Sequence, residues 1–195
     1  MKRLITFAAA ALIGLHAIPL PASTFVAMTE ADLISKSDRV IQGEVLKVHS
    51  HWSKSGRIVV TDATIRVDEV LIGDSPEVIQ VRTFGGRVND FVVETHGFPV
   101  FQAGKKVILY LYEEPSDRSL RVLGYQQGHF RVVTRLDGVT LAVPQVDQAG
   151  RLLRPDGSPV PIPASVEIGA FKRHLRAAAE KLGRTDIHRS PASHR

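Results

Sequence analysis

The chain has 195 residues, no cysteine, a formal net charge of +5 and a pI near 9.7. The absence of cysteine excludes a disulfide-stapled scaffold, a thiol nucleophile, a thiolate zinc site and a lipid anchor attached through cysteine. The charge is uneven: Ser23 to Pro163 holds 16 Lys and Arg against 17 Asp and Glu, whereas Ala164 to Arg195 holds 7 against 3. Because the body is neutral and the basic end is typical of a solvated surface, we expect no nucleic-acid partner.

The N-terminus has the pattern of a secretory signal peptide. Lys2 and Arg3 precede an apolar run from Leu4 to Leu15, and the small residue Ala22 follows. The run is shorter than the roughly 20 residues of a spanning helix, which favours a cleaved signal over the alternative of a membrane anchor. We therefore predict that residues 1–22 are removed and that one secreted or periplasmic domain remains, with no membrane span.

A short helix and a bent strand are predicted next. The helix covers Thr29 to Lys36, with Thr29 as its cap and Asp32 placed for a capping box. Val40 to Val48 is rich in Val, Ile and Leu, which favours a strand. Gly43 lies inside it, and a glycine at such a position indicates a bulge or tight bend.

Alternating apolar residues predict further strands. Ala63 to Val67 alternates with polar residues as a half-buried strand does, and Val70 falls out of phase, which indicates another bulge. Ile79 and Val81 repeat the alternation. Val107 to Leu111 is apolar at every position, as expected of a central strand that is buried on both faces.

Turn residues organise the C-terminal third. Asp137-Gly138 lies between alternating apolar residues and predicts a hairpin, and Pro155-Asp156-Gly157 predicts a turn. Ser165 is then placed to cap a helix that Gly183 ends. The apolar stripe of that helix consists of Ile168, Phe171, Leu175, Ala178 and Leu182.

Together these elements predict a mainly β fold. We expect a small OB-like antiparallel β-barrel over residues 23–163, with a short N-terminal helix. A C-terminal helix over 164–183 packs on the barrel, because its apolar stripe needs a cover. Residues 184–195 are expected to form a disordered basic tail.

Three segments resemble a known family. Ser37–Ile41, Val67–Gly73 and Lys105–Leu111 resemble, in order and spacing, the N-terminal OB-fold domain of tissue inhibitors of metalloproteinases. The resemblance implies an OB-like barrel and makes an exported metalloprotease the first candidate partner. Those inhibitors reach the protease zinc through an N-terminal cysteine, however, and this chain has none.

A closer likeness is to uncharacterised secreted bacterial proteins, which carry V-x-G-x-V, E-V-x-x-G, a glycine pair and G-x-P-x-F-x-x-G-x-x-V-x-L-x-L. Here the pair is Gly85 and Gly86, and Ile41 replaces the first valine. The likeness again implies an OB-like barrel. The last pattern is matched by Gly97, Pro99, Phe101, Gly104, Val107, Leu109 and Leu111.

Two histidines are candidate metal ligands. His49 and His51 are two apart on a predicted strand, so both rings project from one face. This spacing holds a metal if a third ligand comes near, and Glu94, His96 and His129 are the candidates. The alternative, which we favour, is a polar hairpin tip, because serines and a lysine surround the pair. We therefore expect no metal and no other cofactor.

The sequence carries no strong catalytic motif of the H-E-x-x-H, G-x-S-x-G, P-loop or EF-hand type. Asp68-Glu69 and Glu113-Glu114 alternate across a strand or lie at its exit, so neither pair can act on one substrate. The chain is therefore predicted to be non-catalytic.

The segment from Phe84 to Gly104 is long for a loop of a compact β domain and rich in aromatic residues, which is typical of a binding surface. The alternative is that Phe98 and Phe101 fill the end of the barrel. Trp52 is either an exposed anchor on a hairpin tip or a lid over the core. The predicted binding residues are Trp52, Gly85, Gly86, His96, Phe98 and Phe101.

These observations predict a secreted, non-catalytic binding module whose partner is a protein rather than a small ligand. The alternative is an exported enzyme accessory or hydrolase with a His-based site that has no sequence signature. Convergence of His49, His51 and His96 on a concave pocket favours the alternative, whereas a flat aromatic face favours protein binding.

Overall fold

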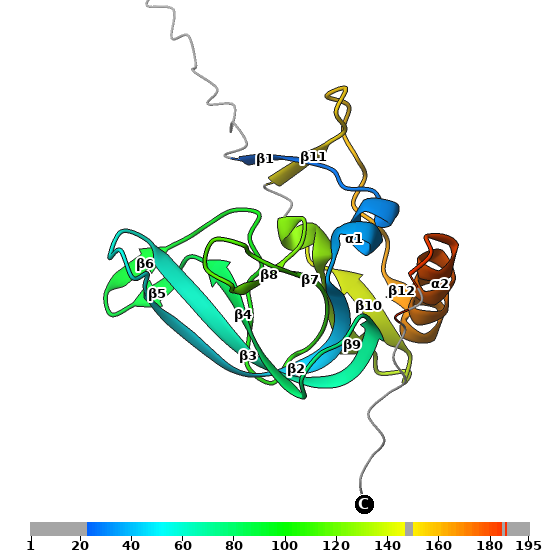
Figure 1. Cartoon of the computed structure of the whole chain (residues 1–195), viewed down its shortest axis with the longest axis horizontal. Helices are drawn as coiled ribbons and strands as arrows, with labels where there is room; N and C mark the ends of the chain where they lie inside the picture. The colour runs from blue at the N-terminus through cyan, green and yellow to red at the C-terminus, as the bar shows by residue number, and fades with distance from the viewer. Residues whose placement is uncertain (1–22, 147–149, 185, 187–195) are drawn as a thin grey trace, which may run out of the picture.

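A closed five-stranded barrel forms the centre of the protein, which is mainly β, and one helix near each end of the chain lies on the same side of the barrel (Figure 1). The computed structural model describes residues 23–146, 150–184 and 186. The barrel order is β7-β2-β3-β4-β8, and the predicted OB-like barrel is confirmed. Its strands are β2 (Arg39–Trp52), β3 (Val59–Ile72), β4 (Val78–Phe84), β7 (Lys106–Glu113) and β8 (Leu120–Val122).

The short strand β8 closes the barrel. It pairs antiparallel with β7, where Leu111 lies opposite Val122, and parallel with β4 through Val81 and Leu120. This one parallel pairing was not expected from the sequence, which predicted an antiparallel barrel throughout. Closure leaves the barrel without the open edge that a flat five-stranded sheet would have.

Strands β2 and β3 are long and bend around the barrel. Each has 14 residues, and their register shifts at three points along the pair. Gly43 lies at one shift, where an added Cβ would be 2.3 Å from the carbonyl oxygen of Arg66. Another shift lies between Val40 and Ile41, which is opposite Val70. Both predicted bulges are therefore confirmed.

Strand β7 separates two cores. Val107, Leu109 and Leu111 face the barrel interior, whereas Ile108 and Tyr110 belong to a second cluster outside the barrel wall. This explains why the sequence from Val107 to Leu111 is apolar at every position, as predicted for a central strand. The outer cluster also contains Leu33, Ile34, Val40, Leu71, Ile72, Ala142, Leu175 and Ala179.

The sheet continues past the barrel through β9 (His129–Thr134), β10 (Thr140–Pro144) and β12 (Val166–Glu167). β9 and β10 form the predicted Asp137-Gly138 hairpin, with Gly138 at a φ of 83°. A positive φ favours glycine, which is why the dipeptide was informative. This extension carries the outer core on which both helices pack.

The N-terminal helix α1 (Glu30–Lys36) begins at the predicted capping box. The Thr29 hydroxyl accepts a hydrogen bond from the Asp32 amide at 3.0 Å, and the Asp32 carboxylate accepts one from the Thr29 amide at 3.3 Å. Both amides would otherwise lack partners in the first turn. Leu33 and Ile34 then face the outer core.

The C-terminal helix α2 (Ile168–Lys181) starts later than the sequence predicted. Glu167, not Ser165, is its N-cap, and its carboxylate accepts hydrogen bonds from the amides of Gly169 and Ala170 at 2.7 Å each. The reason is that Val166 and Glu167 pair with β10 as β12, which keeps the chain extended up to the helix.

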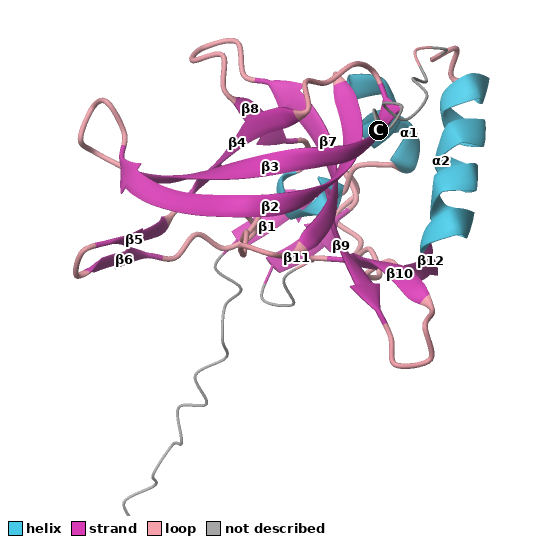
Figure 2. Cartoon of the chain, turned by 90° about the horizontal axis from the view of Figure 1, so that it is seen from below, coloured by secondary structure: helices cyan, strands magenta, loops and turns pink. Residues whose placement is uncertain are grey.

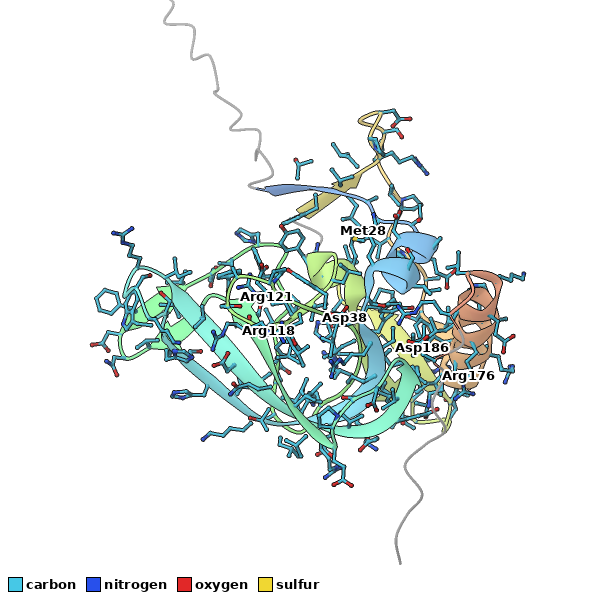
Figure 3. All side chains as sticks on the ribbon, in the orientation of Figure 1. Met28, Asp38, Arg118, Arg121, Arg176 and Asp186 are labelled. Atoms are coloured by element: carbon cyan, nitrogen blue, oxygen red, sulfur yellow. The ribbon has the colours of Figure 1, made fainter. Side chains whose placement is uncertain are left out.

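Helix α2 packs against the outer core through Leu175, which is 1% exposed, and Ala179. The helix lies beside the end of the sheet that β10 and β12 form (Figure 2). Glu69 of β3 accepts from Lys172 at 2.5 Å and from Arg176, labelled in Figure 3, at 2.7 Å. One carboxylate thus fixes two successive turns of the helix on the barrel wall.

Both ends of the described chain lie against the fold. Strand β1 (Ser23–Val26) pairs parallel with β11 (Gly150–Leu153), and the sequence did not indicate this pair. Arg184 was predicted to lie in a disordered tail, but its guanidinium donates to the carbonyls of Ile34, Ser37 and Asp38. The predicted signal peptide, residues 1–22, and most of the predicted tail lie outside the described residues. No helix in the described ranges is both long and apolar enough to cross a membrane.

Candidate functional site

The sequence predicted a long loop between β4 and β7, but this segment contains secondary structure. It first forms a small hairpin, β5 (Gly86–Val88) and β6 (Phe91–Val93), joined by Asn89 and Asp90. Asn89 has a φ of 52°, a left-handed conformation that asparagine tolerates well. The hairpin lies at the end of the molecule opposite α2 (Figures 1 and 2).

A cavity of about 790 Å³ lies between this segment and the end of the barrel. It is lined by side chains from β2, β3 and β4, from the segment itself, and from Gln126, His129, Pro144 and Gln145. Five of the six predicted binding residues line it, namely Gly85, Gly86, His96, Phe98 and Phe101.

Hydroxyl groups of the barrel hold the segment in place. The Thr61 hydroxyl donates to the Gly85 carbonyl at 2.6 Å and shares a 2.8 Å hydrogen bond with Ser50. The Thr83 hydroxyl donates to the Pro99 carbonyl at 3.0 Å. These bonds occupy the hydroxyl groups of Thr61 and Thr83, which line the cavity.

The glycine pair brings the hairpin onto this floor. Gly86 has a φ of 125°, and an added Cβ would lie 2.3 Å from the hydroxyl oxygens of both Ser50 and Thr61. Gly85 has a φ of 84°, and its Cβ would lie 2.6 Å from the hydroxyl oxygen of Thr95. Both glycines are therefore positioning residues, because only a hydrogen side chain fits.

Aromatic rings form one wall of the cavity. Phe98 meets Phe84 edge-on, with centroids 5.2 Å apart, and meets Tyr125 in the same way at 4.9 Å. Phe101 is 6% exposed and belongs to the barrel core, so it fills the barrel end, as one sequence interpretation held. Its ring also lines the cavity, which the two alternatives did not foresee.

His129 is the most unusual group of this wall. Its side chain is 2% exposed, both ring nitrogens lack hydrogen-bond partners, and its ring lies 5.3 Å from that of Phe101. Burial lowers the pKa of His129 to about 4, because charging an imidazole away from water is unfavourable. The ring is therefore neutral at pH 7. Sequence patterns do not indicate this burial, and they make His129 a candidate metal ligand only.

Trp52 lies away from the cavity, at the outer end of β2. It is 41% exposed and contacts the ring of Phe91 edge-on, with centroids 5.9 Å apart. Trp52 is therefore an exposed residue of a hairpin tip and not a lid over the core. The exposed apolar residues at these two hairpin ends are Trp52, Ile58, Phe91, Val92 and Val93.

His49 and His51 share a face, as predicted, with rings stacked 5.7 Å apart. That face is not the cavity, whose lining includes Val48 and Ser50 but neither histidine. His96 lies on the cavity rim, so the three histidines do not converge. Across the described residues, no group of three or more His, Asp or Glu side chains is arranged to hold a metal ion.

His51 is held by its neighbours. Its Nε2 lies 2.9 Å from a carboxylate oxygen of Asp62, and its Nδ1 lies 2.9 Å from the Trp52 carbonyl. The hydrogen bond to Asp62 raises the pKa of His51. Burial alone would raise the pKa of Asp62, but hydrogen bonds from Arg82 and His51 lower it. Since both ring nitrogens of His51 are occupied, neither is free to accept a substrate proton.

No protein-family model and no curated protein matches the chain.

Proposed function

We infer that the protein is an exported, non-catalytic binding module that captures an extended segment of a partner protein at the edge of β6. One observation carries this proposal. Within the described part of the chain β6 pairs with β5 alone, and its side chains Phe91, Val92 and Val93 are 64%, 49% and 37% exposed. An exposed apolar edge strand is a template for a strand of another chain.

The backbone of this edge favours a polypeptide over other ligands. A two-residue turn joins Val88 to Phe91, so these two form a hydrogen-bonded pair, and the next pair, Arg87 and Val92, does not. The amide and carbonyl of Val92 therefore point toward the open edge. Proteins usually protect such an edge with lysine, proline or a covering loop, and β6 has neither residue type.

Trp52 supplies a side-chain anchor next to the edge. Buried tryptophan and phenylalanine side chains commonly dominate the energy of a protein interface. Trp52 and Phe91 already contact each other, so little side-chain freedom would be lost when a partner covers them.

Two parts of the proposal rest on sequence. Export rests on Lys2, Arg3 and the apolar run that follows. A metalloprotease partner rests on the resemblance to its tissue inhibitors. Because the chain has no cysteine, any inhibition would come from covering the protease cleft and not from zinc chelation.

Site-specific photo-crosslinking tests the proposal. A photoreactive phenylalanine analogue replaces Phe91 in the exported protein, and the cells that make it are irradiated. We expect one protein to be cross-linked through an internal segment. The matched control carries the analogue at Leu136, which is fully exposed on another hairpin. Identical adducts from both positions, or none from Phe91, would contradict the proposal.

Two substitutions at Val92 distinguish the contribution of its backbone amide to partner binding from that of its side chain. Val92→Pro removes the outward amide, and proline is tolerated at such an edge position. Val92→Ala keeps the amide and removes apolar surface. We expect Val92→Pro to abolish the cross-link and Val92→Ala to weaken it. Equal effects of the two changes would argue against strand addition.

A further inference from the structure

The cavity is a second candidate binding site, and it does not depend on the open edge of β6. Its volume of about 790 Å³ falls within the usual range of small-molecule sites, roughly 300–1,000 Å³. Its wall is mainly apolar, with Phe84, Phe98, Pro99, Phe101 and Pro144 among the lining residues. Apolar walls with a few fixed polar groups are typical of sites for organic ligands.

His129 supplies the fixed polar group. A buried polar atom without a partner destabilises the folded state, so protein interiors contain few of them. Here two such atoms belong to one ring that lines the cavity and is 2% exposed. A neutral imidazole offers one donor and one acceptor, which match a hydroxyl or carboxamide group.

The ring is also preorganised. Phe101 packs against it, and Phe101 is itself fixed in the barrel core. Both nitrogens have almost no accessible surface, so a ligand must displace the side chains over them, but the ring that it then meets is already oriented.

The charges of the lining select against an ionic ligand. Arg87, Glu94 and His96 line the cavity but are exposed, so they belong to its rim. The buried hydroxyls of Thr61 and Thr83 are already committed to backbone carbonyls. A charged group placed beside His129 would lose its hydration, and Arg131, whose charge acts on that ring, does not line the cavity.

From these observations we propose that the cavity binds a small, uncharged, mainly apolar organic molecule whose hydroxyl or carboxamide group hydrogen-bonds to His129. This site adjoins the edge of β6, since Val92 and Val93 also line the cavity, but it uses a different polar group. Loss of either activity leaves the other proposal standing, because one depends on the His129 ring and the other on the Val92 backbone.

Two probes of nearly equal size test the proposal by NMR. 2-Naphthol carries a hydroxyl group and naphthalene does not. We expect 2-naphthol to shift the ring-nitrogen signals of His129 and to bind about tenfold more tightly than naphthalene, as one buried hydrogen bond provides. Equal affinities, or shifts confined to Trp52 and its neighbours, would overturn the proposal.

Variants complete the test. His129→Phe keeps a flat ring without nitrogens, and we expect it to bind the two probes equally. The matched control, His49→Phe, lies outside the cavity and leaves the tenfold preference intact. If His129→Phe does not fold, Val100→Trp replaces it, since Val100 is 73% exposed and lines the cavity. We expect the indole ring that Val100→Trp introduces to weaken the binding of both probes, and unchanged binding would refute the site.

Discussion

Trp52 and Phe91 come from separate hairpins, yet their rings meet edge-on with centroids 5.9 Å apart. The contact joins the end of the long strand β2 to the short strand β6. It places the single tryptophan of the chain beside the edge that we propose as the binding site. Trp52 is therefore a natural fluorescent reporter of events at that edge.

The first prediction concerns this reporter. Phe91→Ala should shift Trp52 emission to longer wavelength, because the indole loses its apolar neighbour and gains water contact. Stability should change by less than about 1 kcal/mol, since Phe91 is already 64% exposed. Emission spectra and urea melts measure the two effects. Leu136→Ala serves as the control, and an unshifted spectrum for Phe91→Ala would show that the ring contact is not formed.

The second prediction concerns the docking of α2. Leu175→Ala should lower the free energy of unfolding by about 3 kcal/mol, because a buried leucine leaves a cavity behind. Leu182→Ala, at the end of the same helix, should have little effect because Leu182 is 45% exposed. Urea denaturation of the two variants gives the comparison. Equal stabilities would mean that α2 does not pack on the outer core.

The third prediction concerns acid sensitivity. The pKa of His129 falls from 6.5 in the unfolded chain to about 4 in the folded one. Between those values the unfolded state binds more protons, so stability must fall as the pH drops from 6.5 toward 4. The full loss from this group is about 3 kcal/mol. Urea melts across this range should show a flatter pH profile for His129→Phe than for His49→Phe, and parallel profiles would contradict the burial of a neutral His129.

The fourth prediction concerns the glycine pair. Gly86→Ala should displace the β5–β6 hairpin, because its Cβ would meet two hydroxyl oxygens at 2.3 Å. Gly104 has a φ of 76° but open space around an added Cβ. Gly104→Ala therefore introduces backbone strain without a steric clash. Gly86→Ala should therefore be clearly more destabilising in thermal melts, and it should shift more cavity NMR signals. The reverse order would argue against the observed seating of the hairpin.

Sequence predicted the elements whose cause is local. The capping box of Thr29 and Asp32, the turn at Gly138 and the bulge at Gly43 each depend on a few adjacent residues. The fold class was also predicted from the sequence. The alternation of apolar residues in the strands and the continuous apolar run of β7, which is buried on both faces, can be read along the chain.

Long-range contacts explain what sequence missed. The closing strand β8 has three residues, and its pairing depends on where β4 and β7 come together. The β5–β6 hairpin had a two-residue turn signal in Asn89-Asp90, but strands of three residues are too short for a periodic pattern. His129 looked like any strand histidine, since its burial arises from Phe101 and other residues distant in sequence.

Five of the six predicted binding residues do meet at one cavity, although sequence reasoning treated them as an exposed surface. Glycines and aromatic residues are the features that single out this segment in the sequence. Its curvature over the barrel end could not be foreseen, because that shape depends on the Thr61 and Thr83 hydrogen bonds to the segment backbone.

Hydrogen exchange at the Val92 amide tests the central claim most directly. The exchange rate is measured in the free protein and in the complex with the partner that cross-links at Phe91. Strand addition predicts that exchange at Val92 slows at least about tenfold in the complex, because its outward amide gains a backbone acceptor. An unchanged rate at Val92, with protection at another surface of the protein, would contradict the account.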